Sequence, residues 1–271
     1  MKSITFFDLE IDANSHGIAD IGGIKSNGET FHSTSIRDFL DFLDGTGYVC
    51  GHNIFKHDLK YMEKVISIVG AGGKTTLVHK LAREYHRSGK GVLVTTTTHM
   101  YVEADTDLSC DFFALRDKII KDGYCMAGQK ISEQKISEQK ISEQSKSKMC
   151  GLPYDLLDKL IKGMPQALDY VIIEADGAKH HSLKYPAADE PVIYPGTTDV
   201  IIVLGTWEKG RSCKDVVFRY ELMQKELGTA EDAVVDDSII DTLRQVYVRK
   251  LRDSGFEGRV SCVFANERGW F

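Results

Sequence analysis

The chain has 271 residues, of which 42% are hydrophobic and 27% are charged, and its formal net charge is −6. These values are ordinary for a globular protein, and the negative balance supplies no global positive field to attract nucleic acid or an anionic membrane. No apolar run approaches the roughly 20 residues needed to cross a bilayer. The N-terminus carries acidic residues where a signal peptide needs an apolar core. We therefore expect a cytoplasmic protein with no membrane segment, and we disfavour nucleic acid as a partner.

The cysteines are spread singly along the chain, with no CxxC pair. This spacing favours isolated reduced thiols in a cytosolic protein over a zinc site or a compact disulfide framework. The residues concerned are Cys50, Cys110, Cys125, Cys150, Cys213 and Cys262.

The first 64 residues predict two strands, a helix, a strand and a second helix. Apolar and β-prone runs place strands at residues 4–7 and 17–24. Apolar residues at helical spacing predict a helix over residues 36–43, which Gly45 ends. A brief strand at residues 48–50 precedes a helix over residues 58–64. Residues 1–64 are thus expected to form a small α+β piece.

From Val65 onward, strands alternate with helices. The strands are almost wholly apolar, as expected where both faces of a parallel sheet are covered. This pattern predicts an α/β domain over residues 65–271, with a mostly parallel sheet flanked by helices. The strands are expected at residues 65–69, 91–95, 170–174, 199–204 and 259–264, with a helix at residues 75–87.

A five-residue repeat interrupts this second piece. The sequence KISEQ begins at Lys130 and recurs from Lys135 and Lys140. Because a period of five matches neither a helix face nor a heptad, the repeat forms no single apolar face. We expect residues 129–148 to be a solvated low-complexity insertion.

A glycine-rich turn follows the strand at residues 65–69 and opens the next helix. Glycines allow several backbone N–H groups to point at one anion, and the helix N-terminus adds its positive dipole end. Lys74 is expected to reach the β- and γ-phosphates, and the Thr75 hydroxyl to ligate Mg²⁺. The loop departs from GxxxxGK[ST], since Ile68 stands where that pattern has its first glycine. The alternative is a glycine-rich turn with an accidental lysine. The expected nucleotide-binding set is Gly70, Ala71, Gly72, Gly73, Lys74, Thr75 and Thr76.

Further polar residues follow two other predicted strands at the same sheet edge. The strand at residues 170–174 ends in Glu174, and Asp176 follows it closely. Because ligands in open α/β sheets bind beyond the carboxyl ends of the strands, either carboxylate is a candidate to hold Mg²⁺ or to orient an attacking water. Lys74, Glu174 and Asp176 are the candidate catalytic residues, and Thr75 and Asp176 the candidate metal ligands. His99, which follows Thr95 to Thr98, is a further candidate contact to substrate or phosphate.

Residues of this second piece resemble the selenium-dependent hydroxylase accessory proteins of the YqeC family. The resembling stretches are VISIVGAGGKTTLVHKLA, GKGVLVTTTTHMY, DYVIIEADGAKHHSLKYPAADEPVIY and TDVIIVLG, between Val65 and Gly205. The resemblance implies a P-loop NTPase-like protein linked with the maturation of selenium-dependent molybdenum hydroxylases. By position, Lys179 and Lys184 would line the site beside Asp176, with Glu190 a weaker candidate. The alternative for each lysine is an ordinary exposed side chain.

The resemblance implies ATP or GTP with Mg²⁺ as cofactors, and a molybdenum hydroxylase or its cofactor-maturation proteins as partners. A guanine-specifying loop would read Asn-Lys-x-Asp after a late strand, but here the last predicted strand is followed by AlaAsnGluArgGly, residues 265–269. The base therefore stays unassigned, and either it is read elsewhere or this C-terminus is short.

The first piece resembles the start of a DnaQ-like (DEDD) 3′–5′ exonuclease. The resemblance is strongest to the exonuclease-like segments that occur fused to RecQ-type helicases. The resembling residues are Asp8-Leu9-Glu10 and the run GHNIFKHD at residues 51–58. In such enzymes carboxylates clamp two metal ions for attack on a phosphodiester. The resemblance implies an RNase H-like fold, with Asp8, Glu10 and Asp58 as three of four metal ligands. No segment supplies the fourth before residue 65, so an incomplete and inactive nuclease segment is expected. Chance acidic residues are the alternative.

The leading hypothesis is a nucleotide-binding, NTP-hydrolysing accessory protein for molybdenum hydroxylase maturation. Three alternatives stay open: a metal-dependent exonuclease, a nucleotide-controlled docking switch without significant turnover, and an ATP-dependent ligase. The absence of a recognisable second substrate domain argues against the ligase.

Overall fold

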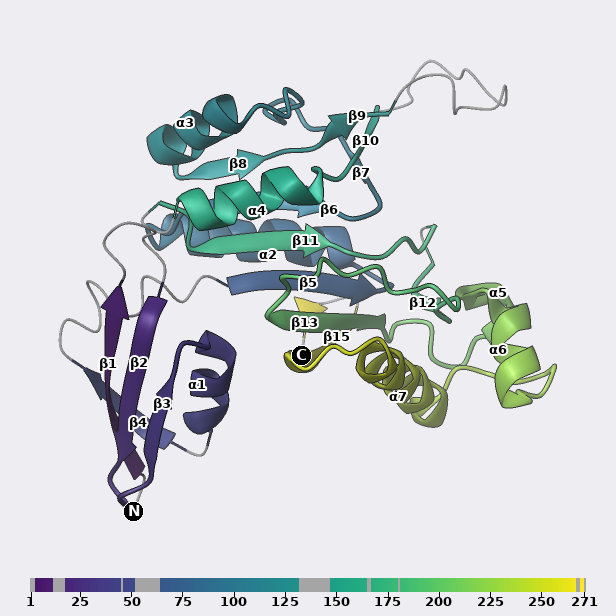
Figure 1. The fold of residues 1–271 in the computed structure, drawn as a ribbon. Coiled ribbons are helices and arrows are strands. Elements are labelled where there is room, and N and C mark those ends of the chain that lie inside the picture. The colour runs from purple at the N-terminus through teal and green to yellow at the C-terminus, as the bar shows by residue number, and fades with distance from the viewer. Residues whose placement is uncertain are drawn as a thin grey trace.

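The computed structural model describes residues 3–11, 18–44, 46–51, 64–131, 147–164, 167–179, 181–266 and 269–270 (Figure 1). The core of the repeat insertion, residues 132–146, lies outside this set. Among the described residues, no helix is long and apolar enough to cross a membrane.

The N-terminal residues form a four-stranded sheet in the order β3-β2-β1-β4. β1, β2 and β3 are antiparallel neighbours, whereas β4 runs parallel to β1. Helix α1 packs on this sheet, and the rings of Phe39 and Phe7 lie 4.8 Å apart. The elements are β1 (Ser3–Ile11), β2 (Ile18–Lys25), β3 (Thr30–Ser33), α1 (Ile36–Phe42) and β4 (Thr46–Gly51).

In this piece, the described structure departs from the sequence-based expectations at β3 and after β4. The strand β3 was not predicted, because its four residues carry only one strongly apolar side chain, Phe31. The helix expected at residues 58–64 falls outside the described residues, apart from Lys64, which begins β5. The RNase H-like character of this piece stays a prediction.

A seven-stranded sheet forms the centre of the rest of the chain, in the order β16-β15-β13-β5-β11-β6-β8. All strands of this sheet except β16 run parallel to one another, and the short β16 is antiparallel to its neighbour β15. This arrangement confirms the predicted mixed α/β architecture. The strands are β5 (Lys64–Gly70), β6 (Val92–Thr96), β8 (Tyr124–Met126), β11 (Tyr170–Glu174), β13 (Asp199–Gly205), β15 (Arg259–Asn266) and β16 (Gly269–Trp270).

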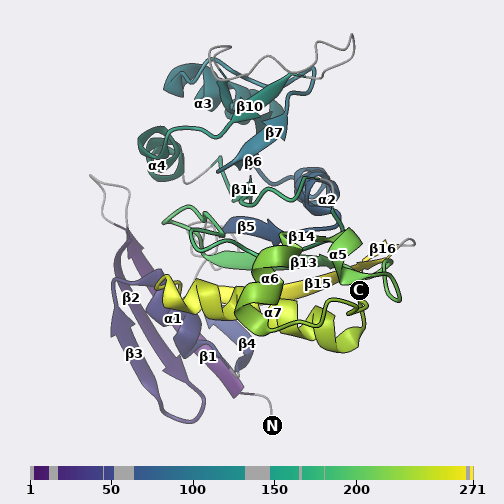
Figure 2. The ribbon, with the colours of Figure 1, turned by 90° about the vertical axis from the view of Figure 1, so that its right-hand side faces the viewer.

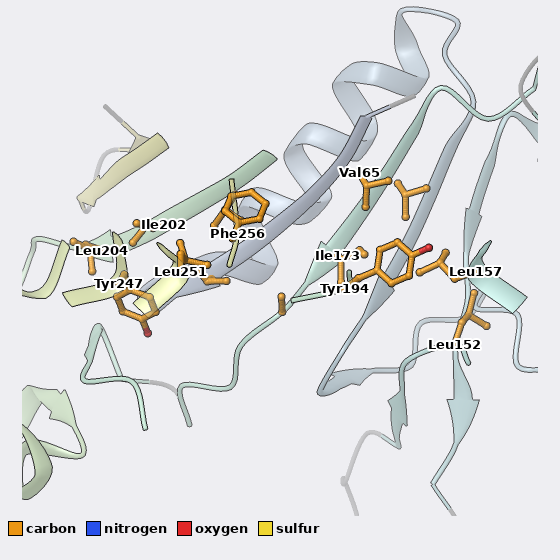
Figure 3. Close-up of a cluster of buried hydrophobic side chains, with 14 of the residues drawn as sticks. Val65, Leu152, Leu157, Ile173, Tyr194, Ile202, Leu204, Tyr247, Leu251 and Phe256 are labelled. Carbon is orange, nitrogen blue, oxygen red and sulfur yellow. The ribbon is translucent and has the colours of Figure 1, made fainter. Parts of the chain in front are cut away.

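Helices cover both faces of this sheet, because successive strand residues point to opposite sides. Val65 and Val69 of β5 pack with α3 (Phe112–Asp122), α4 (Tyr154–Gly163) and α7 (Asp237–Asp253). The alternate residues Ile66 and Ile68 pack instead with α2 (Lys74–Arg87). Figure 2 shows α2 and α4 on opposite sides of the sheet. In Figure 3, Tyr247 and Leu251 of α7 lie beside Ile202 and Leu204 of β13.

The order of the strands reverses at β5. From β5 the chain builds β6 and β8 on one side and returns to place β11 next to β5. It then crosses to the other side for β13 and β15. The loop after β5 therefore lies at a topological switch point, where open α/β sheets form their ligand-binding crevice.

Two small sheets border this crevice. The first has the order β7-β10-β9, and the second pairs β12 with β14 in parallel. In sequence, the repeat lies between β9 and β10. The elements are β7 (His99–Tyr101), β9 (Gln129–Lys130), β10 (Lys148–Cys150), β12 (Leu183–Lys184), α5 (Cys213–Val216), β14 (Val217–Phe218) and α6 (Tyr220–Leu227).

Candidate functional site

Only three residues, 71–73, separate β5 from α2, and glycine is required at the turning points of the phosphate loop that they form with Gly70. Gly70, Gly72 and Gly73 adopt φ angles of 95°, 78° and 109°, which side-chain-bearing residues rarely take. A Cβ on Gly70 would lie 2.2 Å from the Val203 carbonyl oxygen, and one on Gly72 would lie 2.5 Å from that of Ser182. The loop is therefore packed against β13 and the segment before β12, and it leads directly into the first turn of α2.

Lys74 begins α2 and turns back over this loop. Its side chain is buried, and Nζ donates to the Gly70 carbonyl oxygen over 2.8 Å. Burial lowers the pKa of Lys74, while the nearby carboxylates of Glu174 and Asp176 oppose that shift. An incoming phosphate would favour the charged ammonium in the same way as these carboxylates do.

Thr75 faces the end of β11. Its hydroxyl donates to Glu174 Oε2 over 2.7 Å. On the other side of β11, the Thr96 hydroxyl donates to the Glu174 carbonyl oxygen over 2.6 Å, which fixes the backbone there. Burial raises the pKa of Glu174 despite the opposing charge of Lys74 and the bond from Thr75. A carboxyl group with a raised pKa is suited to accept a proton at neutral pH.

Asp176 is enclosed, with no exposed side-chain surface. One of its oxygens, Oδ2, accepts the Gly70 amide over 3.1 Å and the Tyr247 hydroxyl over 2.8 Å. The other, Oδ1, forms an ion pair with Lys184. Asp176 thus ties the loop to α7 and to β12, so its contacts in this structure hold the loop in place.

Lys184 is fully buried, so the reading of it as an ordinary exposed lysine is wrong. Besides Asp176, its Nζ contacts the Gly177 carbonyl oxygen at 2.6 Å and Glu190 Oε2 at 2.7 Å. Glu190 also pairs with Arg219 through both carboxylate oxygens. Burial works to raise the pKa of Glu190, but the bonds from Arg219 and Lys184 outweigh it and lower the pKa to about 2. An unbroken polar network therefore connects Gly70 to Arg219.

A cavity of about 760 Å³ opens over the loop. It brings together many of the residues expected from the sequence: Gly72, Gly73, Lys74, Thr75, Thr76, His99, Glu174, Lys179 and Glu190. Four other expected residues lie buried behind its wall: Gly70, Ala71, Asp176 and Lys184. Its volume lies within the range of about 300–1,000 Å³ typical of small-molecule sites.

Sequence reasoning missed several residues of this site. Trp207, Arg219 and Lys148 line the cavity, and Tyr247 supports Asp176 from α7. Trp207 stands two residues after the end of β13, and that position at the carboxyl edge of the sheet was an available signal. Tyr247 gives no such signal, because it reads as one of several apolar residues on a helix face.

The chemistry of the site fits a phosphate chain with Mg²⁺. Anions favour a glycine loop at a helix N-terminus beside a lysine. Mg²⁺ is usually held by one or two protein oxygens together with substrate phosphates and waters, and Thr75 and Glu174 present such oxygens side by side. Among the described residues, no three His, Cys, Asp or Glu side chains form a metal cluster of their own.

The residues expected for a nuclease site are only partly described. Asp8 and Glu10 lie two residues apart on β1, so they share one face of the N-terminal sheet, and both are exposed. Asp58 lies outside the described residues. The structure therefore leaves their assembly as a prediction.

Comparison with known proteins places the resemblance on this same region. The family model described as YqeC protein matches residues 66–221. An uncharacterized protein YqeC of Escherichia coli (strain K12) is 30% identical over 174 residues, which cover 63% of this chain and 63% of that protein. The matched family region includes the loop, Glu174, Asp176, Lys184, Glu190 and Arg219.

Proposed function

The chain belongs to the YqeC family, and we propose that it is a nucleotide-binding, NTP-hydrolysing accessory protein for the maturation of selenium-dependent molybdenum hydroxylases. The proposal that the chain binds a nucleotide rests on the placement of Lys74 and Thr75. They follow the glycine-rich turn of residues 70–73, line one cavity, and stand next to a buried carboxylate at the neighbouring strand end. The link with hydroxylase maturation rests on the family resemblance.

In this proposal the loop, the first turn of α2 and the two nearby carboxylates have separate tasks. The backbone N–H groups of Gly72 and Gly73 and the first turn of α2 receive the phosphate oxygens, and Lys74 neutralises their charge. Thr75 and Glu174 hold the Mg²⁺ that accompanies the phosphates, directly or through water. Asp176 keeps the Gly70 amide and therefore the loop in position.

For hydrolysis, Glu174 is the better placed of the two candidate carboxylates. It lines the cavity, whereas Asp176 has no exposed surface. Its raised pKa suits a residue that orients a water molecule and accepts its proton. We therefore expect Glu174→Gln to slow phosphate release far more than it weakens nucleotide binding, with release measured as inorganic phosphate produced per enzyme.

One observation also favours nucleotide-controlled docking as a second function. The loop is connected to α7 through Tyr247 and, through Lys184 and Glu190, to Arg219 at the start of α6. Binding of a nucleotide at the loop would therefore affect the contacts of two helices, α6 and α7, through these residues. If docking is the role, binding to a molybdenum hydroxylase depends on nucleotide while turnover stays slow.

Thermal unfolding tests the proposal in the whole chain. A ligand that binds only the native state raises the unfolding midpoint. We expect ATP or GTP with Mg²⁺ to raise it in the wild type and to have little effect in Lys74→Ala, with molybdopterin nucleotides screened alongside. An equal shift in both proteins would remove the proposed role of Lys74.

For the cellular role, Lys74→Ala should fail to restore selenium-dependent hydroxylase activity to cells that lack this protein.

A further inference from the structure

Trp207 lies on the β13 side of the phosphate loop, with Gly205 between the indole and the loop. It follows the end of β13 by two residues, lines the cavity, and is 38% exposed. A Cβ on Gly205 would lie 2.8 Å from Cη2 of the indole, and a Cβ on Gly72 would lie 2.7 Å from the Gly205 Cα. The indole, Gly205 and the loop are therefore in consecutive van der Waals contact.

The rings of Tyr101, Phe218 and Trp207 all line this cavity, but they differ in what contacts them. Lys148 Nζ lies 5.1 Å from the centre of the Tyr101 ring. The Phe218 ring has Arg219 at 4.8 Å and a stacked His181 ring at 5.4 Å. Among the residues that the structure describes, neither a cation nor another ring stacks on Trp207. Its partly exposed indole is thus free to take a flat ligand group.

The two sides of β5 provide different chemistry. On the β11 side, Thr75 and Glu174 offer oxygens for Mg²⁺ and the terminal phosphates. On the β13 side, the indole packs on Gly205, which in turn lies next to Gly72 of the same loop. A nucleotide whose phosphates occupy the loop would extend its base toward the side that offers this aromatic surface.

We propose that Trp207 is the platform on which the base of the bound nucleotide stacks. This inference rests on the proposed nucleotide function, and it adds the position of the base and a residue that contributes to affinity. Stacking of a base on an aromatic side chain is sequence-tolerant, because every base has a π-face. The platform therefore accounts for base binding without the Asn-Lys-x-Asp loop that this chain lacks after its last predicted strand.

Comparing two ligands separates the platform from the phosphate loop. ATP and inorganic tripolyphosphate carry the same phosphate chain, but only ATP has a base. With Mg²⁺ present, we expect Trp207→Leu to weaken ATP binding about 10-fold or more, while tripolyphosphate affinity stays within about 2-fold. Trp207→Phe should recover most of the loss. Phe113→Leu, which removes an exposed ring from α3, should change neither affinity.

Intrinsic fluorescence gives a second test in protein that keeps the indole. The chain has 2 tryptophans, so Trp270→Phe leaves Trp207 as the only tryptophan, whose emission is followed by excitation at wavelengths that tyrosine does not absorb. ATP should quench its emission, whereas tripolyphosphate should not.

Three results would overturn the inference. The first is unchanged ATP affinity in Trp207→Leu. The second is an equal loss for both ligands, which would indicate damage to the loop. The third is emission that ATP leaves unaltered. Failure of the wild type to bind either ligand would instead refute the proposed function itself.

Discussion

The Thr75 hydroxyl donates to Glu174 Oε2 over 2.7 Å, so the first turn of α2 is joined to the end of β11. Thr75 lies in the helix that follows β5, Glu174 ends the neighbouring parallel strand β11, and the two residues are 99 positions apart in sequence. Their proximity places a hydroxyl and a carboxylate, both suited to Mg²⁺, beside the phosphate loop.

Substitution of Thr75 should separate magnesium binding from phosphate binding. Thr75→Val keeps the shape but removes the hydroxyl, whereas Thr75→Ser keeps the hydroxyl. We expect Mg²⁺ to strengthen ATP binding in the wild type and in Thr75→Ser, and to strengthen it far less in Thr75→Val. Calorimetric titration with and without Mg²⁺ measures this. Identical magnesium dependence in Thr75→Val would exclude a role for the hydroxyl.

The loop glycines should be intolerant of even a methyl group. At Gly70 and Gly72, alanine would combine a left-handed backbone with contacts of 2.2 Å and 2.5 Å to carbonyl oxygens. The backbone strain alone costs on the order of 1–3 kcal/mol. Gly22→Ala in the N-terminal sheet is the control, because nothing lies within 4 Å of a Cβ there. We expect Gly70→Ala and Gly72→Ala to lower the free energy of unfolding and nucleotide affinity, and Gly22→Ala to leave nucleotide affinity unchanged; equal effects at all three positions would contradict the account.

The buried ion pair of Asp176 and Lys184 should be sensitive to removal of one partner. Lys184→Met leaves the enclosed Asp176 carboxylate without its cation, which typically costs about 3–5 kcal/mol. In the double variant Asp176→Asn with Lys184→Met, the uncompensated charge is gone, so part of this loss should be recovered. Denaturant unfolding of the wild type, both single variants and the double variant gives the coupling energy. Additive losses would show that the pair does not act as a unit.

Glu190 should make the protein sensitive to acid. Its pKa is lowered from the usual 4.5 to about 2. Because the folded state holds the carboxylate in its charged form, the stabilisation is complete above pH 4.5 and is lost as the pH falls toward 2. The shift corresponds to roughly 3 kcal/mol. We expect Glu190→Gln to have lower stability at neutral pH and a flatter profile between pH 4.5 and 2. Glu231→Gln, at an exposed position, should retain the wild-type profile.

Long apolar runs made the centre of the fold predictable. β11 was expected at residues 170–174, where the structure has it, and β5 extends the expected strand by one residue at each end. The sheet of β7, β9 and β10 was not predicted, since its strands have only two or three residues and pair across the repeat insertion. Such strands carry too few residues for a periodic signal.

The site, like the fold, contains residues that the sequence predicted and residues that it did not. The loop and Glu174 were recognisable because glycine, lysine, hydroxyl and carboxylate stand at strand ends. The burial of Lys184 was not, since it depends on Asp176 and Glu190 folding around it. Tyr247 and Asp176 are 71 positions apart in sequence, and no local sequence pattern predicts a contact between residues so far apart.

Equilibrium titration of nucleotide tests the central claim most directly. Isothermal calorimetry would compare Mg²⁺-ATP and Mg²⁺-GTP binding to the wild type, Lys74→Ala and Lys80→Ala, the last being an exposed lysine on the same helix. The account predicts one nucleotide bound per chain in the wild type and in Lys80→Ala, and affinity lower by about 10-fold or more in Lys74→Ala. Equal affinity in all three proteins, or no binding of either nucleotide to the wild type, would contradict it.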